Sequence, residues 1–304
     1  MKEPVKNVPA SILARLRNQT EEMNRPFAEV LQYFAMERFL YRLSKTKYAD
    51  KFILKGGLLF YVWNISLRRP TRDIDFRGYV SGDSQTLLKI IQDVIEVSAL
   101  EDGFVFDAQS ISVEETQIDA DYQGIRIKLT ALLERTRIPV QIDIGFSDEL
   151  TSQAEPIEYP TLLPDLETVH LKGYPRETVV AEKFHAMIRH GDLNSRMKDY
   201  YDLWLLSETF DFESKSLQKA LETTFENRDT GLPSERPVSL SIEFASATNR
   251  RWNNFLEKMN IRTTESADFV KIMEQVWKFL EYPLQSSLHN TKSTRTWIPM
   301  KGWK

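Results

Sequence analysis

The stretch KGGLLFYVWNISLRRPTRDIDF, residues 55–76, carries the two features that decide the fold. These are an adjacent glycine pair, Gly56 and Gly57, and two acids, Asp73 and Asp75, set among apolar residues. The acid-bearing segment is typical of a strand, in which alternate side chains point to the same side of the sheet. Two like charges held this close repel each other unless a cation lies between them. The stretch therefore predicts a cation site on a strand.

A third acid, Asp143, repeats this arrangement in the segment VQIDIGF, residues 140–146. If its strand lies beside the first one, three carboxylates converge on one spot. Hard oxygen ligands of this kind suit magnesium, and we expect two Mg²⁺ ions held by Asp73, Asp75 and Asp143. The glycine pair adds a seat for phosphates, because backbone without side chains can approach a triphosphate closely.

Composition limits the other kinds of site. The chain has 304 residues, no cysteine and four histidines without zinc-ligand spacing, so a metal is expected to be bound by oxygen. No apolar run approaches the roughly 18 residues that span a bilayer, and a cytoplasmic protein without membrane contact is expected. The net charge of −4 argues against broad electrostatic binding of nucleic acid, which would have to be met by local patches.

The pattern of elements predicts an α+β fold. Two helices are expected within residues 10–50, followed by an α/β unit with a mixed sheet over 51–150. A proline-bearing connection then leads to a mainly helical remainder. We therefore expect two domains, 1–160 and 161–304. The acid-free tail from Tyr282 is expected to pack its tryptophans on the helical domain.

A second group of charged residues lies on two predicted helices, 176–190 and 196–209. Lys183 borders the apolar stripe of the first helix, and Arg196, Asp199 and Asp202 share one face of the second. They can form salt bridges that tie the helices together. Alternatively, the lysine neutralises a triphosphate and an aspartate positions it or takes a proton from the attacking hydroxyl.

Five blocks, in order, carry a family resemblance: FILKGGLLFYVW, RPTRDIDF, IDIGF, ETVVAEKFHAMI and NSRMKDYYDLWLL. They resemble the signature blocks of the AbiEii/AbiGii-type nucleotidyltransferase toxins of bacterial type IV toxin–antitoxin and abortive-infection systems. The resemblance covers about residues 10–210. It implies a bilobed protein with an N-terminal nucleotidyltransferase-like domain, a C-terminal helical domain and an active site between them.

The resemblance also implies roles for individual residues. The expected catalytic residues are Asp73, Asp75, Asp143, Lys183, and either Asp199 or Asp202 as the helical acid. The expected nucleotide-binding residues are Lys55, Gly56, Gly57, Lys183 and Arg196. A nucleoside triphosphate is the implied substrate, and the tRNA 3′ end is the implied acceptor. A separately encoded antitoxin, which need not bind the toxin, is the implied partner.

Two alternatives remain open at this point. The same chemistry could transfer a nucleotide to a protein hydroxyl, or the protein could bind nucleotides without catalysis. With labelled triphosphate, transfer to RNA would label an RNA band, and transfer to a protein hydroxyl would label a protein band. The basic residues Arg68, Arg69 and Arg72, close to the acid pair in sequence, are the candidates for binding RNA phosphates.

Overall fold

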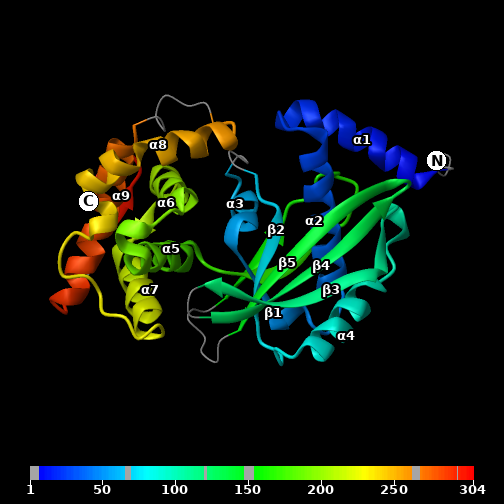
Figure 1. Cartoon of the computed structure of the whole chain (residues 1–304), viewed down its shortest axis with the longest axis horizontal. Helices are drawn as coiled ribbons and strands as arrows, with labels where there is room; N and C mark the ends of the chain where they lie inside the picture. Colours follow the sequence, from blue (N-terminus) through cyan, green and yellow to red (C-terminus); the bar gives the residue numbers. More distant parts are fainter. Residues whose placement is uncertain (1–6, 66–69, 120–121, 147–153, 262–267, 293) are drawn as a thin grey trace. The chain divides into compact units, whose positions relative to one another are not determined.

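The computed structural model describes residues 7–65, 70–119, 122–146, 154–261, 268–292 and 294–304. The chain forms two compact units (Figure 1). The first comprises Met1–Asp148 and Ala154–Tyr174, and the second comprises Glu149–Gln153 and Pro175–Lys304. Within the described part of the chain, each helix is too short or too polar to cross a membrane.

The first unit is built on a seven-stranded sheet. Its elements are α1 (Val8–Met23), α2 (Phe27–Ser44), β1 (Phe52–Lys55), α3 (Leu59–Val62), β2 (Asp73–Gly78), α4 (Ser84–Ile95), β3 (Val105–Asp119), β4 (Tyr122–Leu133), β5 (Thr136–Phe146), β6 (Glu155–Tyr159) and β7 (Val169–Gly173). The strand order is β3-β4-β5-β2-β1-β7-β6. The pairs β2–β5 and β1–β7 are parallel and the other pairs are antiparallel, so the sheet is mixed.

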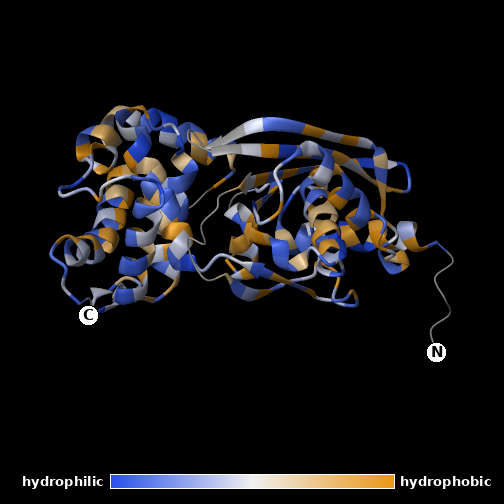
Figure 2. Ribbon diagram, turned by 90° about the horizontal axis from the view of Figure 1, so that it is seen from below, coloured by the Kyte–Doolittle hydropathy of each residue, from blue (hydrophilic) through white to orange (hydrophobic). Residues whose placement is uncertain are grey.

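One face of this sheet is apolar and packs against helices. Ile74, Ile142, Ile144 and Ile127 are at most 1% exposed, and α2 and α4 pack on strands of this sheet. Residues between them in sequence point to the other face and are polar. Figure 2 shows this alternation of hydrophobic and hydrophilic residues along the long strands. Period-two patterning thus puts the core on one face and leaves the other for charged side chains.

The segment 155–173 differs from the sequence prediction. Residues 155–167 were expected to be a connection, with a domain boundary near 160, but β6 and β7 lie within 155–173 and the first unit extends to Tyr174. The prolines that suggested a connection are compatible with this arrangement, because β6 is an edge strand and Pro156 lies in it. The backbone N–H of Leu162 also donates to buried Glu37 of α2 at 2.7 Å, which anchors the segment to the first unit.

The second unit is mainly helical. Its elements are α5 (Arg176–His190), α6 (Met197–Thr209), β8 (Phe212–Glu213), α7 (Ser214–Glu226), α8 (Ile242–Lys258), α9 (Phe269–Leu288), β9 (Thr296–Ile298) and β10 (Gly302–Trp303). Together, the mixed sheet and this helical unit confirm the predicted α+β class. The tail packs its tryptophans as expected: Trp297 is 2% exposed and donates to Ser207 O, and Trp303 stacks on Phe279.

Candidate active site

The three predicted acids meet on the polar face of the sheet. Asp73 and Asp75 lie on β2, and Asp143 lies on β5 directly beside Asp75 in the parallel register. Their carboxylates offer oxygens that all lie within 4.8 Å of one another. Asp73 and Asp75 are half-buried, whereas Asp143 is only 5% exposed. The alternation within DID and the pairing of β2 with β5 therefore produce the convergence that the sequence predicted.

A row of charged residues crosses four adjacent strands at this point. In register, Lys55 of β1 lies beside Asp75, Asp75 beside Asp143, and Asp143 beside Arg126 of β4. Paired residues point to the same face, so the row runs cation, acid, acid, cation. Lys55 Nζ also lies 3.8 Å from the position that a Cβ at Gly145 would take, which places the ammonium over β5. We call these four residues the charged row.

Arg126 was not predicted, although it binds one of the acids directly. Its Nε and Nη2 donate to Oδ1 and Oδ2 of Asp143, both at 2.8 Å, and Gln141 Nε2 donates to Oδ2 at 3.2 Å. The hydrogen bond to Asp143 raises the pKa of Arg126, so this guanidinium stays charged. The signal in the sequence was the alternation in GIRIKL, residues 124–129, which puts Arg126 on the polar face of a strand already expected there.

The glycine pair borders the acids in space as well as in sequence. Gly56 has φ of +70°, a conformation that glycine adopts readily, and a Cβ there would collide with the Asp75 carboxylate. A Cβ at Gly57 would collide with the Thr71 hydroxyl. A 3₁₀ turn begins at Gly56 and leads into α3. Gly56 is half-buried and Gly57 is buried, so the absence of side chains lets the backbone lie directly against the Asp75 carboxylate and the Thr71 hydroxyl.

The segment before β2 is held by α2. Tyr33 Oη accepts from the Thr71 backbone N–H at 2.8 Å, and Gln32 Nε2 donates to Arg72 O at 3.0 Å. Arg72 itself has an exposed side chain and directly precedes Asp73. The other two predicted RNA-binding residues, Arg68 and Arg69, lie outside the described residues. Of the three predicted arginines, the structure therefore describes Arg72, which directly precedes the acid Asp73.

The donor set of the cluster fits a hard divalent cation. Each carboxylate oxygen has two lone pairs, so Asp143 Oδ1 retains one beyond its bond from Arg126. Asp73 and Asp75 add oxygens from one strand, held at fixed spacing by the sheet. Magnesium prefers one or a few carboxylates and completes its coordination with water and phosphate oxygens. These residues can hold such an ion.

The second predicted group forms a salt-bridge set between α5 and α6. Lys183 Nζ lies 2.9 Å from Asp199 Oδ1 and 2.7 Å from Asp202 Oδ2, and Arg196 Nε lies 2.6 Å from Asp199 Oδ2. Both aspartates are fully buried, and the Lys183 side chain is 12% exposed. We call these four residues the buried quartet. The structural alternative from the sequence is thus present in the second unit.

The quartet sets the charge of Asp199. Burial alone would raise the pKa of this carboxyl, but Lys183 and Arg196 outweigh burial and lower it to about 2. A carboxylate with so low a pKa is a weak proton acceptor at neutral pH. Asp199 is therefore better suited to holding the two cations in place than to removing a proton.

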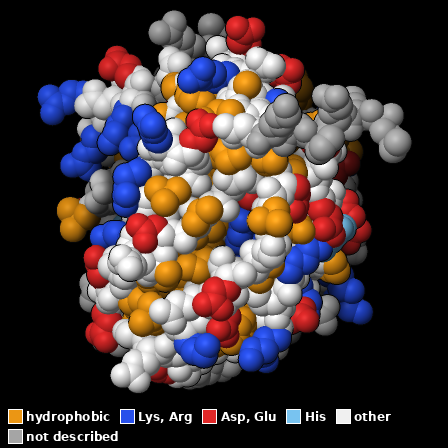
Figure 3. Space-filling model, turned by 90° about the vertical axis from the view of Figure 1, so that its right-hand side faces the viewer, with side chains coloured by type: hydrophobic (Ala, Val, Ile, Leu, Met, Phe, Trp, Pro, Cys, Tyr) orange, Lys and Arg blue, Asp and Glu red, His pale blue; other side chains and the backbone are white. Residues whose placement is uncertain are grey.

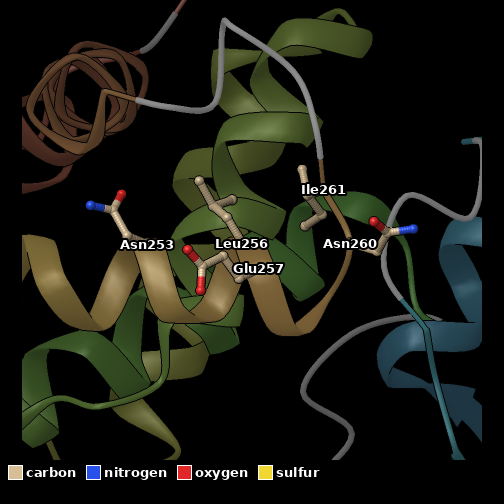
Figure 4. Close-up of a pocket in the computed structure, with 5 residues that line it drawn as sticks. All are labelled: Asn253, Leu256, Glu257, Asn260 and Ile261. Carbon is tan, nitrogen blue, oxygen red and sulfur yellow. The ribbon is translucent and has the colours of Figure 1, made fainter.

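A cavity of about 430 Å³ lies at the C-terminal end of α8 (Figure 4). Its volume is within the range of ligand pockets. Its lining consists of Asn253, Leu256, Glu257, Asn260 and Ile261. Among the described residues, this lining includes an acid and no lysine or arginine, so these side chains are poorly suited to the phosphates of a nucleotide.

Solved structures similar to this chain come from Helicobacter pylori. The chain is similar to the crystal structure of JHP933 from Helicobacter pylori, with a TM-score of 0.51 and 16% identity, covering 86% of this chain and 96% of that one. A crystal structure of a putative nucleotidyltransferase from H. pylori gives a TM-score of 0.49 and 15% identity, with coverage of 83% and 96%. No curated protein matches the chain.

At this level of identity, the likeness to JHP933 shows a shared fold. Membership of a family is shown by the sequence instead. The family model described as "Nucleotidyl transferase AbiEii toxin, Type IV TA system" matches residues 38–281. That span includes β1, the glycine pair, the charged row and the buried quartet. The chain belongs to the family of AbiEii nucleotidyl transferase toxins of type IV toxin–antitoxin systems.

Proposed function

We propose that this protein is a magnesium-dependent enzyme that transfers a nucleotide from a nucleoside triphosphate to an RNA acceptor. The observation that carries the proposal is the convergence of three carboxylates from β2 and β5 beside the half-buried backbone of Gly56. Metal ligands and a phosphate seat are the two features that phosphoryl transfer requires from a protein, since catalysis depends on positioning and charge neutralisation. Family membership supports the transferase activity and the triphosphate substrate.

The residues of the first unit have separate tasks in this proposal. Asp73 and Asp75 would hold Mg²⁺, with Oδ1 of Asp143 as a further ligand. When bound, magnesium would neutralise charge on the phosphates and favour ionisation of the attacking hydroxyl. The glycine backbone would lie against the triphosphate, and Lys55 would compensate part of its negative charge.

The residues of the second unit are assigned by resemblance. We propose that Lys183 and Arg196 contribute to triphosphate binding and that Asp199 holds the side chains of both residues in place. The low pKa of Asp199 supports this positioning role. Asp202 Oδ2 binds Lys183 Nζ at 2.7 Å and completes the set. A salt-bridge set and a phosphate-binding group are compatible, because lysine has three donors.

We propose the tRNA 3′ end as the acceptor, which would inhibit growth by blocking aminoacylation. The test incubates the protein with Mg²⁺, total RNA and each of the four labelled triphosphates in turn. We expect label in the tRNA band with one or a few of the nucleotides, and its loss when EDTA removes the metal. Label in a protein band would show transfer to a hydroxyl of a protein instead. No pyrophosphate release with any nucleotide would contradict catalysis altogether.

A further inference from the structure

Arg126 has hydrogen-bond donors that its partner does not use. A guanidinium carries five N–H groups, and the fork to Asp143 occupies two of them. The other three, two on Nη1 and one on Nη2, are directed away from this fork. Among the described residues none takes a hydrogen bond from them, and the side chain is 35% exposed. The bond to Asp143 therefore fixes a charged group whose remaining donors are open to a ligand.

The place of Arg126 in the charged row indicates which ligand it meets. The glycine pair follows β1 at one end of the row, Asp75 and Asp143 occupy the middle, and Arg126 is at the other end on β4. Adjacent strands are about 4.8 Å apart, so the two ends are separated by the acids. In phosphoryl transfer, the attacking and leaving oxygens lie roughly in line on opposite sides of phosphorus. A triphosphate seated at the glycines leaves the Arg126 end for the acceptor.

We propose that Arg126 binds a backbone phosphate of the acceptor RNA and that Asp143 acts on it as a positioning residue. This inference rests on the proposed function, whose RNA acceptor it places at one end of the charged row. A planar guanidinium held along one edge by a carboxylate can present its other edge to phosphate oxygens in fixed orientation. Figure 3 shows basic, acidic and hydrophobic side chains intermingled on one face of the molecule. Because the net charge of the protein is −4, binding of RNA must depend on local cations such as Arg126.

The first experiment measures binding rather than transfer. Bulk tRNA, and separately a labelled single-stranded RNA with a free 3′ hydroxyl, are titrated with wild type, Arg126→Gln and Arg126→Lys at several salt concentrations. Losing a hydrogen-bonded charge contact should weaken RNA binding by about 10-fold or more for Arg126→Gln. The slope of log K against log salt should become shallower by about 1. Arg126→Lys should bind at an intermediate level, since it keeps the charge and loses the fork.

The matched control is Lys128→Gln, which removes one positive charge two residues along the same face of β4. Lys128 Nζ is held by both oxygens of Glu114, at 3.1 and 2.9 Å, so its charge is already balanced. We expect RNA binding by this variant to stay within about twofold of wild type. Triphosphate binding in Mg²⁺ is measured for Arg126→Gln, Arg126→Lys and Lys128→Gln, none of which removes a proposed metal ligand, and it should also stay within about twofold of wild type.

Arg126→Gln leaves the buried carboxylate of Asp143 without its charged partner and can unfold the protein. The double variant Arg126→Gln/Asp143→Asn removes both charges, and Asn keeps the shape of the buried Asp143 side chain. It should fold, and its RNA binding should be as weak as that of the single variant. Asp143→Asn alone keeps the arginine charge but loosens its orientation, so RNA binding should weaken while the salt slope stays that of wild type.

Each outcome decides for or against the proposal. Unchanged RNA binding in both Arg126→Gln and the double variant would overturn it. Equal losses of triphosphate and RNA binding in Arg126→Gln or Arg126→Lys would also overturn it and assign Arg126 to the nucleotide. If wild type bound no RNA and labelled a protein instead, the proposal would fall together with the RNA acceptor. If Arg126→Gln selectively lost RNA binding while wild type transferred no nucleotide, the proposed function would fail and the Arg126 site would stand.

Discussion

The carboxylates of the first unit lie on a half-buried face of a sheet, whereas Asp199 and Asp202 of the second unit are enclosed between two helices. The first cluster has three acids, and the charged row supplies two cations, Lys55 and Arg126. The buried quartet has two acids and two cations. Charge that balances within the protein stabilises it, while an excess of acids on an accessible face is suited to an added cation. Carboxylates are thus arranged in a way that suits an added cation in one unit and pair with cations of the protein in the other.

The largest effect is expected for Asp75→Asn, which keeps the shape of the side chain and removes a charge from the proposed metal site. Transfer should fall by on the order of 10³-fold, because several kcal/mol of charge stabilisation at the phosphates is lost. Thermal unfolding should be close to that of wild type. The matched control is Glu114→Gln, an exposed acid beside Arg126 on the same face. Full transfer activity in Asp75→Asn would show that the cluster is not the active site.

Lys183→Ala tests whether the quartet is structural. The change leaves Asp199 and Asp202, both fully buried, without the cation between them, and the free energy of unfolding should fall by about 3 kcal/mol or more. From the sequence a loss of no more than about 2 kcal/mol was expected, as for a partly exposed lysine. The 12% exposure of this side chain is the reason for the larger value. Denaturant unfolding measures the difference.

The double variant Lys183→Met/Asp202→Asn separates stability from catalysis. It keeps the apolar stem at 183 and leaves Asp199 paired with Arg196, so at least half of the lost stability should return. If Lys183 also binds the triphosphate, transfer should stay low in this folded protein. Recovery of both stability and transfer would restrict Lys183 to a structural role.

Gly56→Ala tests the contact between the glycine turn and the acids. Its positive φ and the collision of a Cβ with Asp75 should lower the free energy of unfolding by roughly 1–3 kcal/mol and displace that carboxylate. Gly145→Ala is the control, because a Cβ there meets only Lys55 Nζ, at 3.8 Å. Transfer and unfolding are measured for both. Equal effects of the two changes would argue against a special role for Gly56.

The pH dependence of stability gives the smallest effect. The pKa of Asp199 is depressed to about 2, so its contribution is complete above the ordinary carboxyl value and disappears as pH falls through about 4 to 2. We expect wild type to lose about 2 kcal/mol more than Asp199→Asn across that window. Chemical unfolding at a series of pH values compares the two proteins. Parallel curves would mean that Asp199 titrates normally.

Local patterns predicted much of the first unit. The alternation in DID put Asp73 and Asp75 on one face, because strand geometry fixes side-chain direction. Asp143 joins them only because β5 pairs with β2, a condition that the sequence left open. The glycine positions were likewise readable from the sequence. Arg126 was missed, since its importance comes from the register of β4 against β5, a non-local pairing that no local pattern encodes.

The second unit shows a different limit. Helical spacing correctly placed Lys183 beside the apolar stripe of α5 and Asp199 and Asp202 on one face of α6. It could not reveal that both acids are fully buried, because burial depends on the helices packed around them. The edge strand β6 was also missed. It contains Pro156, and a proline suggests a turn unless the strand is known to lie at the edge of a sheet, where proline is tolerated.

The parallel pairings of β2 with β5 and of β1 with β7 also determine when the sheet can form during synthesis. Asp75 leaves the ribosome long before Asp143, and until β5 follows, the acid cluster does not exist. The other edge of β1 stays unpaired until β7, residues 169–173, has also been synthesised. Contacts between such distant segments form slowly, and an unpaired strand edge invites association with other chains. A chain interrupted before Gly173 would therefore be prone to aggregate, even though every residue of the charged row had already been made.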